Sequence, residues 1–397
     1  FVPKEYYGIS LETQDVKWTW RDEKTKSFRT FSRERAEQIK GRLENAALEI
    51  TSVEKKAKKT MAPGLYDLTT LQREANLKYG FSAKETLNIM QRLYENHKVL
   101  TYPRTDSRYI GKDIVPTIKE RLKACGIGPY RKLAGALMNK PVQVNGSFVD
   151  DKKVSDHHAI IPTGKRADRV NLTADERRLY EMVAKRLAAA FYPNYEYDAL
   201  RVVTTCGEDD FLSTGKAVTQ EGWKAVYGGD EGKRKKKADD DEQRLPVLAV
   251  GDERLCRRAQ VTRDQTKPPK EYSDAGILLD MEHAGRQIAD EEIREQMKDC
   301  ALGTPATRAA IIERLIDVGY VRRSGKNLVA TEKGVHLIEA VPPEIASPET
   351  TGRWERALAE IARGSDGEAR FRQGIARLAA FLVQNASGAP DVAFAKE

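Results

Sequence analysis

The sequence predicts a mixed α and β fold, in which a β-rich part is interrupted by one helical block and followed by another. Residues 1–60 and 195–260 contain runs that partly alternate apolar and polar side chains, which is typical of strands. Residues 68–194, and those from Tyr272 onward, instead carry apolar side chains at helical spacing behind capping residues. The expected order of the parts is therefore β, α, β, α.

Composition indicates a globular chain of two to four domains with excess positive charge. Its 397 residues are 40% hydrophobic and 32% charged, and the formal net charge is +8. A basic excess suits a polyanionic partner, because Lys and Arg displace counterions from phosphates. The four cysteines form no CxxC pair, so they indicate a reducing compartment rather than a zinc ribbon or disulfide scaffold. No apolar run can span a membrane and no secretory signal is visible, so we expect a cytoplasmic protein without a membrane partner.

The β-rich part is expected to contain strands in the runs VKWTW and KSFRT, followed by a helix that Ser32 caps. Its second half contains YEYDALRVVTTC, FLSTGKAVTQ and RLPVLAVGD, each of which predicts a strand. The segment GDEGKRKKKADDDEQ, with basic residues followed by acidic ones, predicts a solvated hairpin loop. A nucleic-acid-binding arm is the second interpretation, which the adjacent acids oppose.

Capping boxes mark the starts of two helices in the inserted block. Ser82 and Glu85 begin a helix whose apolar residues fall on one face, and VLTY then predicts a short strand that ends at Tyr102. Thr173 and Glu176 form the second box. In the last block, a helix is expected after Thr304, and the basic turn RRSGKN and the run LVATEKG follow it, an order that resembles a winged helix.

The stretch TYPRTDSRYI places charged and hydroxyl groups directly behind Tyr102. A phenol titrates near about 10 and becomes a better nucleophile when a cation stabilises the phenolate. Arg104 can do this and can also hold a phosphate with two hydrogen bonds. Asp106 can orient either group, and the hydroxyls of Thr105 and Ser107 can donate to phosphate oxygens, although Ser107 can equally cap a helix. The spacing also allows a tyrosine that only packs at a strand end, beside a surface ion pair.

Two further segments carry groups that can bind phosphate. In SDHHAIIPT, His157 and His158 can hydrogen-bond a phosphate or move a proton, whereas a metal site is disfavoured because adjacent side chains diverge. In LGTPATRAAIIERL, the helix start offers free amides, and Thr304, Thr307 and Arg308 add donors. Structural histidines and an ordinary capped helix remain the alternatives. The segment PPKEYSDAGILLDMEHAGRQI by itself predicts a loop that enters an amphipathic helix.

These segments, in this order, resemble the type IA DNA topoisomerases, most closely the topoisomerase III branch. The resemblance covers nearly the whole chain, and TYPRTDS together with HHAIIPT is its most specific part. It rests on LYDLTTLQREAN, LYENHKVLTYPRTDS, SDHHAIIPT, KPPKEYSDAGILLDME and LGTPATRAAIIERLIDVGYV. In that family the tyrosine attacks a phosphodiester of single-stranded DNA. It stays linked to the 5′ phosphate while another strand passes, and the break is then resealed.

The resemblance implies roles for the residues that match its central motif. Tyr102 resembles the nucleophile, and Arg104 resembles the cation that positions the scissile phosphate and stabilises the phenolate. Asp106 and Thr105 resemble its polar supports, and we count Thr105 and Ser107 among the candidates for substrate binding.

The other two segments supply the remaining candidates. His157 resembles the family's active-site histidine, and His158 is the weaker candidate for substrate binding. Thr307 resembles a hydroxyl near the phosphate, and Arg308 beside it is a further substrate-binding candidate.

The resemblance also implies a toroidal, multi-domain arrangement. A β-rich arch would comprise residues 1–61 and 195–269. A helical gate domain that carries the tyrosine would comprise residues 62–194, and a helical, winged-helix-like DNA-binding domain would comprise residues 270–397.

The chain departs from the family in its acidic residues. The family's Toprim domain, with a glutamate and a DxD motif that bind Mg²⁺, has no counterpart in this sequence. We therefore expect Mg²⁺ to serve the complete enzyme, and this chain alone to bind no metal and to be inactive. The alternative is a relic or split subunit that binds single strands without cutting them; a tyrosine recombinase fits less well, because it needs dispersed basic residues and lacks HHAIIPT.

The expected partner is single-stranded DNA, which the resemblance implies and the basic charge suits. The resemblance further implies a bacterial protein associated with the nucleoid or with plasmids, and we expect it to be a monomer.

Overall fold

The computed structural model divides into two compact units, which we call the sheet unit and the helical unit. The sheet unit comprises Phe1–Pro63 and Ala188–Lys270, and the helical unit comprises Gly64–Leu187 and Glu271–Glu397. The structure describes residues 1–125, 131–138, 146–154, 156–228, 245–287, 291, 294 and 301–388. The charged segment GDEGKRKKKADDDEQ, for which a hairpin loop was predicted, lies almost entirely outside these residues.

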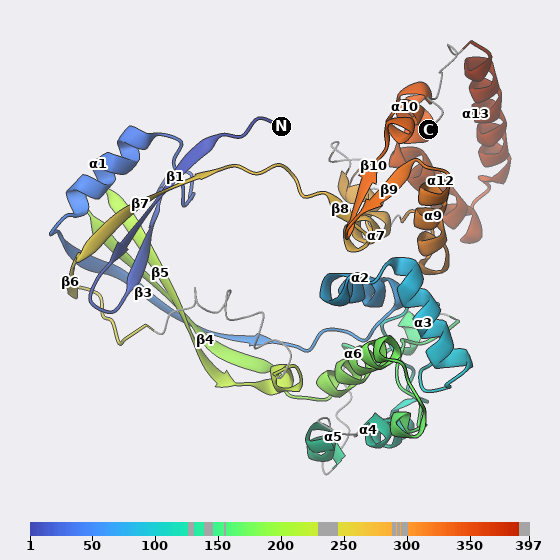
Figure 1. Ribbon diagram of the computed structural model, residues 1–397, viewed down its shortest axis with the longest axis horizontal. Helices are drawn as coiled ribbons and strands as arrows, with labels where there is room; N and C mark the ends of the chain where they lie inside the picture. The colour runs from blue at the N-terminus through green and yellow to red at the C-terminus, as the bar shows by residue number, and fades with distance from the viewer. Residues whose placement is uncertain are drawn as a thin grey trace. The chain divides into compact units, whose positions relative to one another are not determined.

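The sheet unit is built on a seven-stranded antiparallel sheet in the order β6-β3-β4-β5-β2-β1-β7 (Figure 1). Its strands are β1 (Glu5–Glu12), β2 (Lys17–Arg21), β3 (Ala47–Thr60), β4 (Tyr195–Cys206), β5 (Asp209–Gln220), β6 (Glu253–Leu255) and β7 (Arg258–Gln265). Helix α1 (Arg33–Leu43) begins after the predicted cap Ser32, whose side chain accepts a hydrogen bond from the amide of Arg35.

The core of the sheet unit lies between one face of the sheet and α1. Trp18, Trp20 and Phe211 are fully buried there, and Ile39 and Leu43 of α1 pack into the same cluster. The alternation seen in VKWTW is therefore the alternation of β2, in which the two tryptophans face the core and the residues between them face outward.

Two of the strands predicted in the sheet unit are absent, and one strand was missed. The run KSFRT contains only a single bridge, between Thr30 and Tyr7. Residues 245–250 of RLPVLAVGD are not a strand, and β6 begins only at Glu253. The 14-residue strand β3, whose second half is rich in lysine, was not predicted, because only its first half alternates in burial. The backbone pairing of β3 with β4, from Glu49–Thr205 to Thr60–Tyr195, keeps β3 extended although its side chains show no strand pattern.

The helical unit contains helices from both of its chain segments and a three-stranded sheet, β8-β10-β9. The first segment forms α2 (Leu68–Tyr79), α3 (Ala83–Glu95), α4 (Ile118–Cys125), α5 (Arg131–Met138) and α6 (Ala174–Ala190). The second forms β8 (Tyr272–Ser273), α7 (Asp274–Glu282), α9 (Pro305–Asp317), β9 (Val321–Ser324), β10 (Asn327–Ala330), α10 (Glu332–Ala340), α11 (Pro343–Ala346), α12 (Pro348–Ala362) and α13 (Glu368–Gly388).

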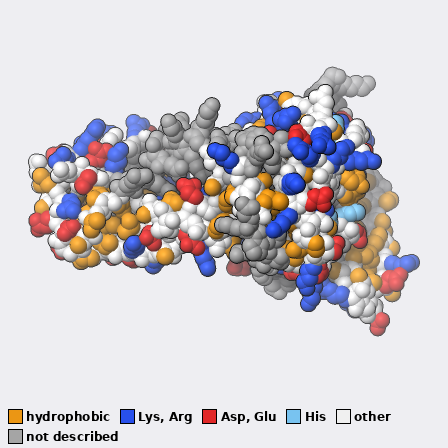
Figure 2. Space-filling model, turned by 90° about the horizontal axis from the view of Figure 1, so that it is seen from below, with side chains coloured by type: hydrophobic (Ala, Val, Ile, Leu, Met, Phe, Trp, Pro, Cys, Tyr) orange, Lys and Arg blue, Asp and Glu red, His pale blue; other side chains and the backbone are white. Residues whose placement is uncertain are grey.

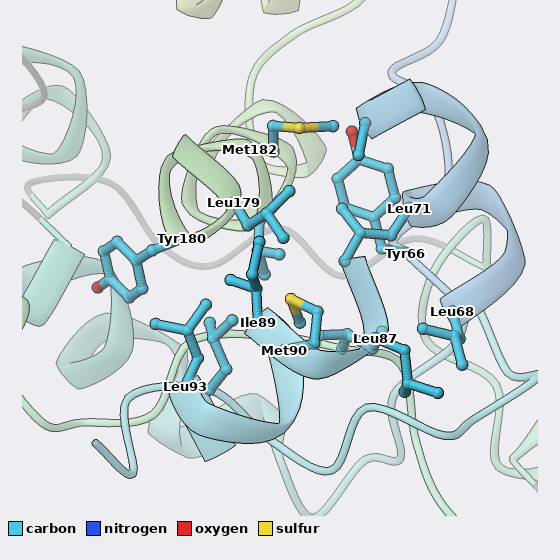
Figure 3. Packing of buried hydrophobic residues seen from close by; sticks show 14 of the residues in the cluster. Tyr66, Leu68, Leu71, Leu87, Ile89, Met90, Leu93, Leu179, Tyr180 and Met182 are labelled. Atoms are coloured by element: carbon cyan, nitrogen blue, oxygen red, sulfur yellow. The ribbon is translucent and has the colours of Figure 1, made fainter. Parts of the chain in front are cut away.

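One hydrophobic core joins the two segments of the helical unit. Figure 3 shows side chains of α2, α3 and α6 converging, among them Leu71, Met90 and Leu179. The same cluster includes Leu278 of α7 and Ile312 of α9. The two blocks that the sequence predicts at 62–194 and 270–397 thus contribute side chains to one hydrophobic core.

The predicted helix starts of the helical unit are confirmed. Ser82 and Glu85 form the capping box of α3, and Thr173 and Glu176 exchange the corresponding hydrogen bonds before α6. The order of α9, β9 and β10 matches the predicted helix and basic hairpin. Within the described residues, no helix is both long and apolar enough to cross a membrane.

Candidate active site

The tyrosine loop, residues 101–110, is held by backbone hydrogen bonds on two sides. The amide of Thr101 donates to the carbonyl of Ile161 at 3.0 Å, and the amide of Ala159 donates to the carbonyl of Tyr109 at 2.8 Å. On the other side, the amide of Leu68 donates to the carbonyl of Thr105 at 3.0 Å. The loop therefore lies between the HHAIIPT segment and the start of α2, and the short strand predicted to end at Tyr102 reduces to a single bridge at Leu100.

Tyr102 lies against His157, so the two motifs meet in the structure. The centroid of its ring is 4.2 Å from that of His157 and 5.5 Å from that of Tyr94, which meets it edge-on. A pocket of about 350 Å³ opens beside the pair. It is lined by Thr101, Tyr102, Gly111, Asp113, Asp151, Val154, Asp156, His157 and His158.

Arg104 and Asp106 project outward because the tyrosine loop is extended and alternates in burial. Pro103, Thr105 and Ser107 point inward, while Arg104 and Asp106 are exposed. Among the described residues, Arg104 has neither a hydrogen bond nor an ion pair. Its guanidinium therefore keeps all of its donors for a ligand.

Thr105 and Ser107, which were predicted as substrate contacts, use their hydroxyls inside the protein. The hydroxyl of Thr105 donates to the carbonyl of His157 at 3.0 Å and accepts from the amide of Ser107 at 3.1 Å. The hydroxyl of Ser107 donates to the carbonyl of Lys153 at 2.8 Å. Both side chains are at most 5% exposed, so they support the backbone between the tyrosine and the histidine. Ser107 does not begin a helix.

The two histidines differ in environment. His157 is exposed at the pocket, next to Tyr102. His158 is half-buried, and its Nδ1 lies 2.7 Å from the carbonyl oxygen of Ala159. This contact occupies one ring nitrogen of His158, whereas the ring of His157 lies against the tyrosine and lines the pocket.

The start of α9 is a capping box with a buried arginine behind it. The hydroxyl of Thr307 accepts from the amide of Thr304 at 2.9 Å. Arg308 is 4% exposed and donates to the carbonyls of Leu302 and Gly303 and to the hydroxyl of Thr69. Arg308, which was predicted to bind substrate, thus ties α9 to α2, while Thr307 stays at the exposed helix start.

The start of α2 links the tyrosine loop to both chain segments, through residues that sequence reasoning missed. Asp67 caps α2 and also accepts from Nε of Arg108 at 2.5 Å. Arg108 donates to the hydroxyl of Thr70 at 2.5 Å and lies 3.6 Å from Glu282 of α7. Burial alone would lower the pKa of Arg108, but Asp67 and Glu282 outweigh it and raise that pKa. Asp67 could have been found from the sequence, because it stands at a helix-cap position in LYDLTTLQREAN. No local pattern indicates that Arg108 is its partner.

Metal ligands do not gather in the described part of the helical unit or of the sheet unit. No group of three or more His, Cys, Asp and Glu side chains there is placed to hold an ion.

Comparison with solved structures supports the fold. The full-length topoisomerase I of Thermotoga maritima is similar over 96% of this chain and 59% of that one, with a TM-score of 0.71 at 22% sequence identity. At this identity the likeness concerns the fold alone.

Comparison with curated sequences is closer. DNA topoisomerase 3 of Bacillus cereus is 45% identical over 374 residues, which cover 92% of this chain and 50% of the relative. DNA topoisomerase 3 of Bacillus subtilis is 40% identical over 374 residues, covering 94% of this chain and 51% of the relative. The chain thus spans about half the length of the curated relatives that it matches. Residues 1–373 match the family described as DNA topoisomerase, and the chain therefore belongs to that family.

Proposed function

We propose that this chain is the tyrosine-bearing core of a type IA DNA topoisomerase of the topoisomerase III branch, acting on single-stranded DNA. The observation that carries the proposal is that Tyr102 and His157 lie together at a pocket. Arg104, two residues after the tyrosine, is exposed and has no partner among the described residues. Figure 2 shows many Lys and Arg side chains on one face of the molecule, with Asp and Glu among them, which suits a polyanionic substrate.

The proposed step is a transesterification at phosphorus. The Oη atom of Tyr102 forms a bond to the phosphorus, and the bond from phosphorus to the 3′ oxygen of the preceding nucleotide breaks. The phenol gives up its proton and the 3′ oxygen takes one up, so the products are a 5′-phosphotyrosine and a free 3′ hydroxyl. The reverse attack by that hydroxyl reseals the strand after another strand has passed.

Each site residue has a part in this step. Arg104 holds the phosphate oxygens and stabilises the negative charge that develops on them. His157 is placed to accept or return a proton near the tyrosine, and Asp106 orients the neighbouring cation. Thr105 and Ser107 keep the loop in register with His157. The exposed hydroxyl of Thr307 at the start of α9 is a further candidate contact for a strand phosphate.

The complete protein has requirements beyond this chain. We propose that it uses Mg²⁺, held by carboxylates of a Toprim domain outside these residues, and that it works as a monomer in the bacterial cytoplasm. Magnesium would offset negative charge at the reacting phosphate when bound.

A covalent-adduct assay tests the proposal with a protein of the relatives' full length that carries this chain. The oligonucleotide is labelled at its 3′ end, because that fragment keeps the phosphate that joins the tyrosine. We expect wild type to give a labelled protein band after denaturation, and Tyr102→Phe to give none while its affinity for the strand stays within about twofold, since only one hydroxyl is removed.

Tyr109→Phe is the matched control, because Tyr109 lies in the same loop with its hydroxyl 3.3 Å from Nζ of Lys153. This variant should form the adduct. An adduct in Tyr102→Phe would place the nucleophile elsewhere. Tight strand binding with no adduct in wild type would instead indicate a protein that binds strands without cutting them.

A further inference from the structure

The sheet unit carries aromatic side chains, one partly buried and one exposed, on and beside the face of β1 that points away from its core. Tyr7, Ile9 and Leu11 are buried on one face of β1, so Tyr6 and Gly8 lie on the other. On the β7 side, Tyr6 is paired with Asp264 and Gly8 with Thr262. The hydroxyl of Tyr6 donates to Asp264 at 3.1 Å, which fixes the tyrosine against the sheet.

The segment 28–31 extends this face on the other side of β1. Strand β2 pairs only with the second half of β1, and Thr30 takes its place beside the first half through two hydrogen bonds with Tyr7, at 2.8 and 2.9 Å. Thr30 is buried, while Arg29 and Phe31 on either side of it are exposed. Alternation therefore puts Arg29 and Phe31 on the same face as Tyr6.

Contacts between these three side chains form a continuous platform. The guanidinium carbon of Arg29 lies 4.9 Å from the ring centroid of Tyr6 and 5.8 Å from that of Phe31. Phe31 is 57% exposed. Gly8 adds no side chain, and a Cβ there would come within 2.8 Å of the hydroxyl of Thr262. We call Tyr6, Arg29 and Phe31 the stacking platform.

We propose that the stacking platform binds unpaired bases of single-stranded DNA, as a strand-binding site separate from the tyrosine pocket; this deepens the proposed function and rests on it. Aromatic faces and an arginine plane bind any base by stacking, and the guanidinium edge can reach a phosphate. The surrounding segment, KSFRTFSR, carries three basic residues and no acid, which suits a nucleic acid better than a basic or neutral partner. Asp264 accepts a hydrogen bond from the Tyr6 hydroxyl.

Photocrosslinking tests the proposal directly. A single-stranded oligonucleotide with 5-iodouracil in place of thymine is irradiated with the purified wild-type protein, and the attached peptides are mapped by mass spectrometry. We expect crosslinks at Tyr6 or Phe31 in addition to those in the helical unit. An oligomer of abasic sugar phosphates, used as competitor, should leave the crosslinks at the platform largely intact because it has no bases to stack.

Substitutions give the quantitative test. Phe31→Ala should weaken binding of the oligonucleotide by about fivefold or more, the usual loss for one stacked base. Phe28→Ala is the matched control, since Phe28 is 47% exposed in the same segment but the centroid of its ring lies 6.0 Å from the guanidinium carbon of Arg21, a different arginine from that of the platform. It should leave binding unchanged, and circular dichroism checks that both variants are folded.

The outcomes separate this inference from the proposed function. If wild type binds the oligonucleotide but crosslinks only within the helical unit, or if Phe28→Ala and Phe31→Ala behave alike, the stacking platform is wrong and the tyrosine site stands. If wild type binds no single strand, both are wrong. If wild type binds and Tyr102→Phe still forms the covalent adduct, the proposed site fails while crosslinks at Phe31 would uphold the platform.

Discussion

Three arginines of the candidate site have different surroundings, and these surroundings decide what each can do. Arg308 is buried and donates to two carbonyls and a hydroxyl, so it is held inside the protein. Arg108 is engaged by Asp67 and Thr70. Arg104 is exposed, and no described residue pairs with it. Only Arg104 can therefore meet an incoming phosphate without first breaking an internal contact.

Arg104→Lys should slow cleavage more than it weakens binding of the strand. A guanidinium can hold two phosphate oxygens in one plane, and an ammonium ion cannot, although the charge is the same. We expect the single-turnover rate of adduct formation to fall by about tenfold or more, as for the loss of an oriented donor, with a change in Kd of a fewfold at most.

Arg177→Lys is the control for this measurement, because Arg177 is an exposed arginine of α6. It should leave both the rate and the Kd unchanged. Cleavage at the wild-type rate by Arg104→Lys would mean that charge alone suffices at this position.

At the scale of elements, α6 is joined to α3 through its capping box. Glu176 is 3% exposed, and it accepts from Arg92 of α3 at 2.8 Å as well as from the amide of Thr173 at 2.9 Å. Burial opposes ionisation of Glu176, but these hydrogen bonds outweigh it and hold the pKa of Glu176 below its ordinary value of 4.5. Glu176 therefore stabilises both the start of α6 and the packing of α6 against α3.

The lowered pKa of Glu176 predicts a loss of stability in acid. A carboxylate with a depressed folded-state pKa stabilises the protein above its unfolded-state value near 4.5, and this contribution disappears as the pH falls through the folded-state value. We expect Glu176→Gln to lower the free energy of unfolding at pH 7 by about 1–3 kcal/mol. The variant should also lose less stability than wild type on titration from pH 5 towards pH 3.

Thermal unfolding followed by circular dichroism measures this effect across the pH range. Glu95→Gln is the control, because Glu95 is exposed at the end of α3 and should unfold as wild type does. A parallel pH dependence in wild type and Glu176→Gln would contradict the assignment to Glu176.

At the scale of the whole molecule, the helices that support the tyrosine loop are held by residues of the second chain segment, more than 150 positions after the loop. Asp274 at the start of α7 accepts from the amide of Ala83 at 3.0 Å, and Arg323 of β9 donates to the same carboxylate at 2.6 Å. Leu278 of α7 is fully buried in the core that α2, α3 and α6 share. The second segment of the helical unit thus stabilises α2, α3 and α6 of the first segment through hydrogen bonds and a shared core.

Leu278→Ala should therefore destabilise both segments of the helical unit. A leucine truncated in a packed core costs about 2–5 kcal/mol, because apolar contacts are lost and a cavity remains. In hydrogen exchange followed by mass spectrometry, we expect faster exchange in α2 and α3 as well as in α7, with the strands of the sheet unit unchanged.

Leu358→Ala in α12 is the control, because that leucine is 45% exposed and its loss should cost far less. Faster exchange confined to residues 271–388 in Leu278→Ala would show that the two segments unfold separately.

Local features were predicted from the sequence because their partners lie within a few residues. The capping boxes of α3 and α6 each join residues three apart, and the start of α9 at Thr304 is equally local. The alternation of β2 likewise needs no knowledge of its neighbours. Strand β3 could not be predicted in this way, since half of it is exposed lysine and alanine that only pairing with β4 keeps extended.

The sequence by itself determined which chemical groups the candidate site contains, because tyrosine, arginine and histidine bring their chemistry wherever they stand, and it determined where α1, α3, α6 and α9 begin. Only the tertiary structure decided which of these groups face a ligand. Arg308 pairs with Thr69, 239 positions away, and the hydroxyl of Thr105 with the carbonyl of His157, 52 positions away. Burial and pairing across such separations depend on how distant segments pack, and no local pattern encodes them, so hydroxyls and guanidiniums that look alike in the sequence become supports in one place and free donors in another.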